Sequence, residues 1–176
     1  AIPALQSSVY LNYGAHGPSP RYVVSAAEAF LETHEFEAPV SDDPYDRAFG
    51  AFERTRTEVA GLINAEPDEI ALTESTTAGI NAVADGLDLP DDAVVVRTDL
   101  EHPTGTLPWQ RLEREGADVR VVQTEQGRVD LDAFQAAVAG ADVACFSAVT
   151  WTHGTRLPVA ELVDIARDAG AFTLVD

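Results

Sequence analysis

The chain has 176 residues, of which 45% are apolar and 7% aromatic, so it is long enough to bury a core and too apolar for an intrinsically disordered protein. It carries 30 acidic residues against 11 arginines, and it has no lysine. The resulting net charge of −19 disfavours binding to nucleic acid or to an anionic membrane surface. Because the acidic residues are scattered and lysine is absent, we expect a halophilic, cytoplasmic protein; an acidic protein from a mesophile is the alternative.

The N-terminal part of the sequence predicts an arm followed by two helices. Residues 1–19 form the arm, in which a short strand at residues 9–12 leads into a turn rich in glycine and proline. Apolar side chains spaced by three and four residues predict helices at residues 21–37 and 46–64. Everything from residue 20 onward is assigned to one domain.

From residue 67 the pattern changes to short apolar runs that alternate with helical segments. Strands are expected at residues 69–72, 93–97, 119–123, 143–149 and 171–175. Helices are expected at residues 77–87, 104–115, 131–139 and 159–169. Such alternation predicts an α/β fold, with a mostly parallel sheet and helices on both of its faces. The single cysteine, Cys145, falls in an apolar run and is interpreted as a core residue.

Three features of the sequence carry chemistry, and each has a plain structural alternative. Residues 72–81 pass from an apolar run through Ser75, Thr76 and Thr77 into a helix, where N–H groups and hydroxyls can bind phosphate; helix capping by Ser75 or Thr76 is the alternative. His102 follows a strand and can lie flat on a planar ring, or it can be a structural histidine. Asp176 ends the last apolar run, where it suits a protonated pyridine nitrogen, or it caps a turn.

These three features share one edge of the predicted sheet, because the carboxyl ends of parallel strands lie together. A single ligand could therefore contact a phosphate cradle, a stacking ring and a carboxylate. The four histidines show no spacing typical of metal ligands, and no metal site is expected.

The same segments resemble a known family. Residues 74–81, residues 101–102 with 107–110, and residues 154–158 leading to 170–176 are similar to motifs of the class V aminotransferases, in the same order. This family of fold type I enzymes that depend on pyridoxal 5'-phosphate (PLP) includes cysteine desulfurases, selenocysteine lyases and isopenicillin N epimerase. The resemblance covers nearly the whole chain, including the arm at residues 10–18.

The resemblance implies a role for each matching residue. Thr76 and Thr77 would bind the cofactor phosphate, His102 would stack on the pyridine ring, and Asp176 would pair with the ring nitrogen. His102 and Asp176 would be the catalytic residues. In the family a Schiff-base lysine and a C-terminal small domain come later in the chain, so we expect these 176 residues to be the N-terminal part of an enzyme and inactive alone. The family also implies a homodimer and an amino-acid substrate.

The sequence departs from the desulfurase pattern in two places. Pro103 and Gly105 stand where desulfurases commonly have a second histidine and an asparagine, and Trp151 stands where many members have an asparagine near the phenolic oxygen of the cofactor. Both departures favour an epimerase-like, lyase or transaminase member. The alternatives are a cysteine desulfurase or selenocysteine lyase, a non-catalytic binding or scaffolding module without the lysine, and an unrelated phosphate-binding domain.

Overall fold

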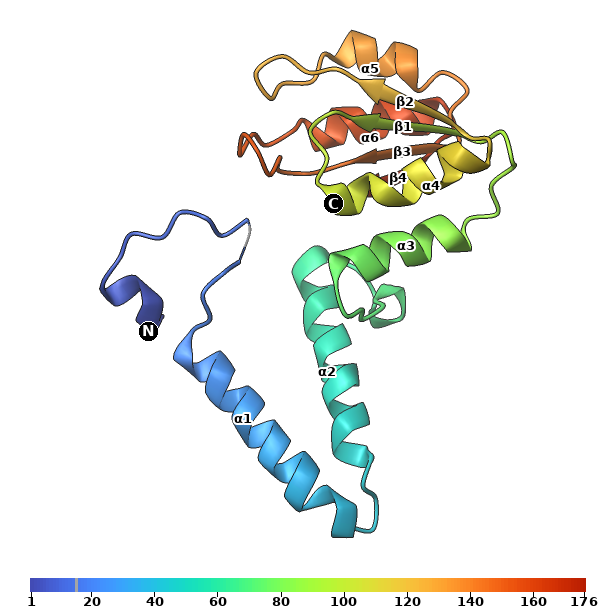
Figure 1. The fold of residues 1–176 in the computed structure, drawn as a ribbon. Coiled ribbons are helices and arrows are strands. Elements are labelled where there is room, and N and C mark those ends of the chain that lie inside the picture. The colour runs from blue at the N-terminus through green and yellow to red at the C-terminus, as the bar shows by residue number, and fades with distance from the viewer. Residues whose placement is uncertain (15) are drawn as a thin grey trace. The chain divides into compact units, whose positions relative to one another are not determined.

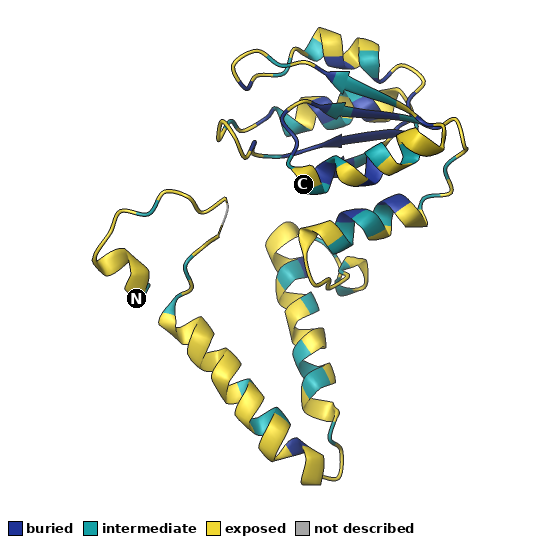
Figure 2. Cartoon of the chain, in the orientation of Figure 1, coloured by how far each residue is buried: buried dark blue, intermediate teal, exposed yellow. Residues whose placement is uncertain are grey.

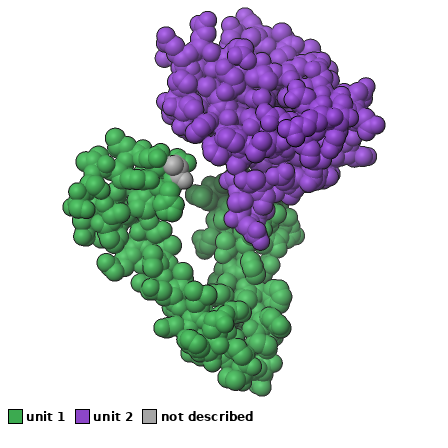
Figure 3. Space-filling view, in the orientation of Figure 1, with its two compact units in different colours: residues 1–72 green, residues 73–176 purple. Residues whose placement is uncertain are grey.

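The computed structural model describes residues 1–14 and 16–176. Ala15, which falls within the turn expected after the N-terminal strand, lies outside the described residues. The chain divides into two compact units, Ala1–Leu72 and Thr73–Asp176 (Figure 3). None of the described helices is both long enough and apolar enough to cross a membrane.

The first unit is helical. Its elements are η1 (Pro3–Gln6), α1 (Arg21–Phe36), η2 (Ala38–Val40), α2 (Asp46–Ile63) and η3 (Pro67–Glu69). The two helices expected from apolar spacing are confirmed to within one residue at each end. α2 ends because Asn64 adopts the left-handed conformation (φ 58°), which an asparagine tolerates and which stops helical propagation.

The predictions of short strands at residues 9–12 and 69–72 are wrong. Residues 9–12 form no regular element, and the side chains of Val9 and Leu11 are both 88% exposed, so they bury nothing against a neighbouring strand. The segment expected as a strand from residue 69 begins instead with the 3-10 turn η3. Here Glu66 and Glu69 form a capping box, in which the Glu66 N–H donates to Glu69 Oε2 at 2.8 Å.

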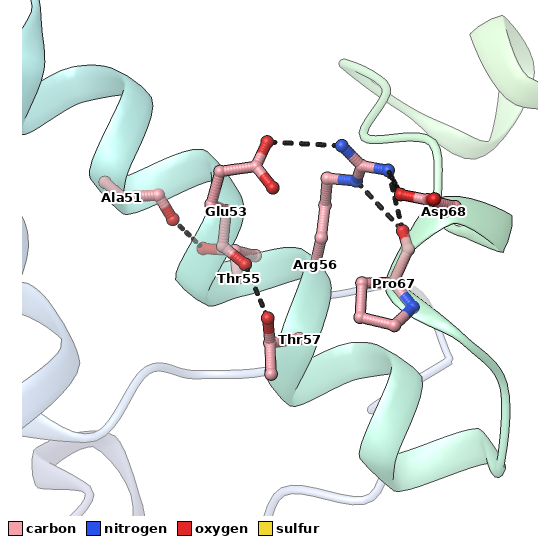
Figure 4. Close-up of polar contacts among 7 residues, drawn as sticks. All are labelled: Ala51, Glu53, Thr55, Arg56, Thr57, Pro67 and Asp68. Atoms are coloured by element: carbon pink, nitrogen blue, oxygen red, sulfur yellow. Dashed lines mark hydrogen bonds and ion pairs between the residues drawn. The ribbon is translucent and has the colours of Figure 1, made fainter.

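Arg56 joins α2 to η3 (Figure 4). Its Nε and Nη2 both donate to the carbonyl oxygen of Pro67, at 3.0 and 2.8 Å. The same guanidinium pairs with the carboxylates of Glu53 and Asp68 at 3.2 and 3.3 Å. One planar side chain thereby fixes the turn that follows α2.

Much of the apolar surface of α1 and α2 is exposed, as the largely yellow helices in Figure 2 show. The exposed apolar side chains on these helices are Tyr22, Val23, Val24, Leu31, Phe36, Phe49, Phe52, Leu62 and Ile63.

The second unit is an α/β layer structure. Its helices are α3 (Thr76–Gly86), η4 (Pro103–Gly105), α4 (Leu107–Glu115), α5 (Leu131–Ala137) and α6 (Val159–Asp168). Its strands are β1 (Val94–Thr98), β2 (Asp118–Val122), β3 (Val143–Phe146) and β4 (Phe172–Val175). The sheet order is β2-β1-β3-β4 and every pair is parallel, which confirms the predicted fold class (Figure 1).

Each face of the sheet has its own core because successive side chains of a strand point to opposite faces. On one face, Val96 of β1 and Ala144 and Phe146 of β3 pack with Phe134 of α5 and Leu162 of α6. The rings of Phe134 and Phe146 meet edge to face at 5.8 Å.

The other face of the sheet is covered by α3 and α4. There Val95 and Cys145 pack with Ile80 of α3 and Trp109 of α4. Cys145 is completely buried, as its position in an apolar run predicted.

The parallel arrangement brings all strand ends to one edge of the second unit. Three loops or residues leave that edge in turn: residues 99–102 after β1, residues 147–151 after β3, and Asp176 after β4. Figure 1 shows the C-terminus and the first turn of α3 on this same side of the unit. This edge therefore holds the residues that the sequence singled out.

Candidate functional site

The first turn of α3 presents exposed hydrogen-bond donors. Ser75 caps the helix: its Oγ accepts from the Ala78 N–H at 3.2 Å, and its carbonyl accepts from the Gly79 N–H at 3.0 Å. The capping alternative for Ser75 is thus correct, and it leaves Thr76 and Thr77 as the first two helical residues, both exposed. N–H groups in a first helical turn have no intrahelical acceptor, so they and the two hydroxyls are available to an anion.

His102 stands directly after the loop that leaves β1. It is the N-cap of η4, and its Nδ1 accepts from the Thr104 N–H at 3.3 Å and lies 3.0 Å from Thr104 Oγ1. In the neutral ring this places the proton on Nε2. Pro103 restricts the backbone of His102 to the extended conformation that it adopts (φ −61°, ψ 151°).

The indole of Trp151 also contacts this imidazole. The two ring centroids are 5.1 Å apart and the planes cross at 83°, which is an edge-to-face contact. Trp151 reaches His102 because β3 ends at Phe146, three residues earlier than expected, and the chain then turns. The turn is held by Thr150, whose Oγ1 accepts from the Thr155 N–H at 3.0 Å, and by the bridge between Val149 and Arg156.

Glu101 is a buried carboxyl group between two strand ends, and it was not among the candidate residues. Its Oε1 lies 2.5 Å from Thr98 Oγ1 on β1, and its Oε2 lies 2.6 Å from Ser147 Oγ after β3. The residue is only 6% exposed. The sequence gives no signal for it, because an acidic residue in a loop after a strand is ordinarily exposed.

Electrostatic effects in this region follow from burial. Burial raises the pKa of Glu101 above its ordinary 4.5; hydrogen bonds from Ser147 and Thr98 oppose the rise, and the nearby negative charge of Asp176 adds to it. Burial also raises the pKa of the Cys145 thiol to about 12, against a smaller opposing effect of the Trp109 indole. Cys145 is therefore a neutral core thiol, not a nucleophile.

Asp176 ends β4 on the exposed side of the sheet edge. Its backbone is fixed to β3, because its N–H donates to the Phe146 carbonyl at 3.0 Å and its own carbonyl accepts from the Ala148 N–H at 2.6 Å. The side chain is not needed for these bonds. Asp176 can therefore present its carboxylate to a ligand at the strand ends.

His102 and Asp176 thus lie at the same edge of the sheet, after the ends of β1 and β4. Glu101 precedes His102 in the chain and senses the charge of Asp176. The helix that carries Thr76 and Thr77 packs against η4, which starts next to His102. Within residues 1–14 and 16–176, no group of three or more histidine, cysteine or acidic side chains is placed to hold a metal ion.

These residues fit PLP as a donor set. The start of α3 offers N–H and hydroxyl donors suited to a phosphate, His102 offers an aromatic ring held by Thr104 and Trp151, and Asp176 offers a carboxylate suited to a protonated ring nitrogen.

Comparison with known proteins places this arrangement in a family. The model of the aminotransferase class-V family matches residues 9–176. A probable cysteine desulfurase of Methanothermobacter thermautotrophicus is 38% identical over 99% of this chain, which corresponds to 44% of that relative. The chain therefore spans less than half the length of this relative.

Solved structures agree on the fold. The apo structure of a cysteine desulfurase from Thermococcus onnurineus NA1 is 26% identical and superposes with a TM-score of 0.85, covering 99% of this chain and 45% of that one. A C-DES mutant with glycine covalently linked to its PLP cofactor is 23% identical, with a TM-score of 0.87, and covers 99% of this chain and 46% of that one. The match over residues 9–176 and the shared parallel sheet confirm the resemblance seen in the motifs: the chain belongs to the aminotransferase class-V family.

Proposed function

We propose that this chain supplies the phosphate-binding, ring-stacking and ring-nitrogen contacts of a PLP-dependent enzyme that acts on an amino acid. The observation that carries the proposal is that the ends of β1 and β4 lie at the same edge of the parallel sheet. His102, which follows Glu101 at the end of β1, lies at the same sheet edge as Asp176 at the end of β4.

Each residue has a distinct task in this proposal. Thr76 and Thr77 bind the phosphate through backbone and hydroxyl donors at the positive end of the α3 dipole. His102 packs on one face of the pyridine ring, held in place by Thr104 and Trp151. Asp176 keeps a proton on the ring nitrogen by placing a negative charge beside it. When bound, PLP supplies an electron sink for a carbanion at the substrate carbon.

The reaction within the family is the finer part of the proposal. A relative that is 38% identical bears the name probable cysteine desulfurase, which supports release of sulfur from an amino acid. Pro103, Gly105 and Trp151 instead support an epimerase-like, lyase or transaminase reaction, since the desulfurase pattern is altered where substrate and cofactor would meet. We rank desulfuration first and epimerisation second.

The whole protein is proposed to be a cytoplasmic homodimer. The exposed apolar side chains of α1 and α2 support association with a second copy, because isolated monomers rarely leave so much apolar helix surface in water. For the 176-residue chain alone we expect no turnover, because PLP chemistry uses a lysine amine and the chain has no lysine.

The test is a titration of the full-length protein with PLP, followed by absorbance, and then an assay of a panel of L-amino acids that includes cysteine. We expect binding, and product from at least one amino acid. The His102→Ala variant should bind PLP about tenfold more weakly, because it loses an aromatic stacking contact worth about 1 kcal/mol and its buried area.

A matched control is His153→Ala, which removes an exposed histidine whose Nδ1 lies 2.8 Å from the hydroxyl of the neighbouring Thr152. Binding of PLP without turnover of any amino acid would support the non-catalytic module instead. Failure of the wild-type protein to bind PLP would refute the proposal.

A further inference from the structure

Gly127 lies in a tight turn within the loop that follows β2. Glu125 and Arg128 exchange two backbone hydrogen bonds, at 3.0 and 2.9 Å, around the two residues between them. Both of these, Gln126 and Gly127, have positive φ, 50° and 77°, as in a type I′ turn. Gly127 is buried, whereas the other three residues of the turn are exposed. The turn therefore packs against the rest of the protein through its glycine.

The glycine packs against a second turn, residues 150–155, in the loop that follows β3. A Cβ atom on Gly127 would lie 2.7 Å from Cγ and 2.8 Å from Cβ of His153, and 2.9 Å from Oγ1 of Thr155. Rotation of the imidazole moves Cγ, but the Cβ of His153 is fixed by the backbone. Any side chain at residue 127 would therefore displace the backbone of one of the two turns.

The second turn carries Trp151, whose indole contacts the imidazole of His102. Thr150 closes this turn, because its N–H donates to the Thr155 carbonyl at 2.9 Å and its Oγ1 accepts from the Thr155 N–H at 3.0 Å. Thr150 is 1% exposed, so water does not compete for these hydrogen bonds. A displacement of Thr155 therefore moves Trp151 as part of the same hydrogen-bonded turn.

The turn at residues 125–128 is also tied to the loop that carries His102. Thr124, next to this turn, donates its hydroxyl to Asp99 Oδ1 at 2.8 Å, and the Asp99 N–H donates to the Val122 carbonyl at 3.1 Å. The loop after β2 therefore contacts both of the loops whose aromatic side chains meet, the one after β1 and the one after β3.

We propose that Gly127 is a positioning residue for the proposed cofactor site. Because it has no side chain, the turn after β2 closes on the Cβ of His153 and on Thr155. This contact fixes the turn that carries Trp151, and it thereby holds the indole against the imidazole of His102. The inference rests on the proposed function, since its consequence is the orientation of the ring that would stack on PLP.

The first test does not need the cofactor. The full-length protein is labelled with 5-fluorotryptophan, and the fluorine resonance of Trp151 is identified by its loss in Trp151→Phe. Gly127→Ala should shift or broaden this resonance, because the turn that carries the indole is displaced. An unchanged Trp151 resonance in Gly127→Ala would overturn the proposal.

The matched control is Gly140→Ala. Gly140 also has a positive φ, 70°, but no atom lies within 4 Å of a Cβ placed there. The two substitutions therefore share the backbone cost of alanine at positive φ, and only the one at Gly127 adds a steric displacement. Gly140→Ala should leave the Trp151 resonance in place, and equal changes in both variants would contradict a specific role of Gly127.

The second test measures the dissociation constant of PLP by absorbance titration of the full-length protein. Gly127→Ala should raise this constant about threefold to tenfold, as expected when an aromatic contact is lost, and Gly140→Ala should leave it unchanged. In a Trp151→Ala background, Gly127→Ala should add little further loss, because both substitutions remove the same interaction. A full additional loss in that background would contradict action through Trp151.

Two further variants keep the outcome decisive. If Gly127→Ala does not fold, Gly127→Asn takes its place with Gly140→Asn as its control, because asparagine tolerates positive φ better and adds the same Cβ atom. His153→Gly removes the two nearest atoms, so Gly127→Ala should change the Trp151 resonance less in this background than in wild type. An equal change would contradict the steric cause. If the wild-type protein does not bind PLP, the proposed function fails, while the fluorine resonance still decides whether Gly127 positions Trp151.

Discussion

The imidazole of His102 meets the indole of Trp151 edge to face, with ring centroids 5.1 Å apart and planes at 83°. The two residues come from loops that leave different strands, β1 and β3, which are neighbours in the sheet. Together with the bond from Thr104, this contact leaves the imidazole little rotational freedom. A departure from the usual desulfurase pattern, Trp151, thus acts on the residue expected to stack on the cofactor.

We expect Trp151→Ala to weaken PLP binding about threefold to tenfold, since an aromatic pair contributes about 0.5–1.5 kcal/mol. Trp151→Phe retains a ring at this position and should preserve most of the affinity. Absorbance titration of the full-length protein with PLP measures both. Equal affinities of the alanine variant and wild type would show that the contact does not position His102.

Replacement of Asp176 should affect the rate more than the binding of PLP. Asp176→Asn removes the charge that stabilises a protonated ring nitrogen, and we expect kcat to fall about a hundredfold, as is typical when one electrostatic contact to the reacting system is lost. The dissociation constant of PLP should rise far less. Asp168→Asn, which alters an exposed residue of α6, is the control, and an unchanged kcat in Asp176→Asn would remove the electron-sink role.

Stability should decline at high pH because of Cys145. Burial raises the pKa of this thiol from 9.0 to about 12, so the folded protein keeps a proton that the unfolded chain releases above about pH 9. The stabilisation is complete below pH 9 and is lost as the pH rises toward 12, by at most about 1.4 kcal/mol per pH unit. Urea unfolding of wild type and Cys145→Ala between these pH values measures it; identical slopes would contradict the raised pKa.

Arg56 should stabilise the junction of α2 and η3. Arg56→Ala removes two donors from the Pro67 carbonyl, and we expect a loss of about 1–3 kcal/mol in local stability. Amide hydrogen exchange at the C-terminal end of α2 reports on it. Arg54→Ala, an exposed arginine two residues away, should leave exchange unchanged, and similar exchange in both variants would show that the junction is held by other contacts.

Salt should stabilise the protein. With a net charge of −19, like charges repel across the surface, and raising the salt from about 0.1 M to about 1 M shortens the screening length from about 10 Å to about 3 Å. Tm should therefore rise with KCl. A variant that replaces the exposed Asp91 and Asp92 by asparagine should respond less, and a Tm independent of salt would speak against the expected halophilic character.

The sequence was a good guide wherever a pattern is local. Helices α1 and α2 follow from apolar residues spaced by three and four, and the parallel sheet follows from apolar runs that alternate with helices. The expected strand at residues 69–72 failed for a reason that apolar content does not reveal. A segment becomes a strand only beside a partner, and the Glu66–Glu69 capping box had already committed the preceding backbone to a turn.

The same contrast between local pattern and tertiary contact holds for the candidate site. The sequence by itself determined the types of residue available: donors at the start of α3, a histidine after β1, a carboxylate after β4 and no lysine. Only the tertiary structure decided that Glu101 lies between Thr98 and Ser147, and that Trp151 contacts His102. These contacts join residues that are far apart in the chain, and they arise because parallel strands β1 and β3 end side by side. Burial at that edge then raises the pKa of Glu101, and burial is a property of the folded chain.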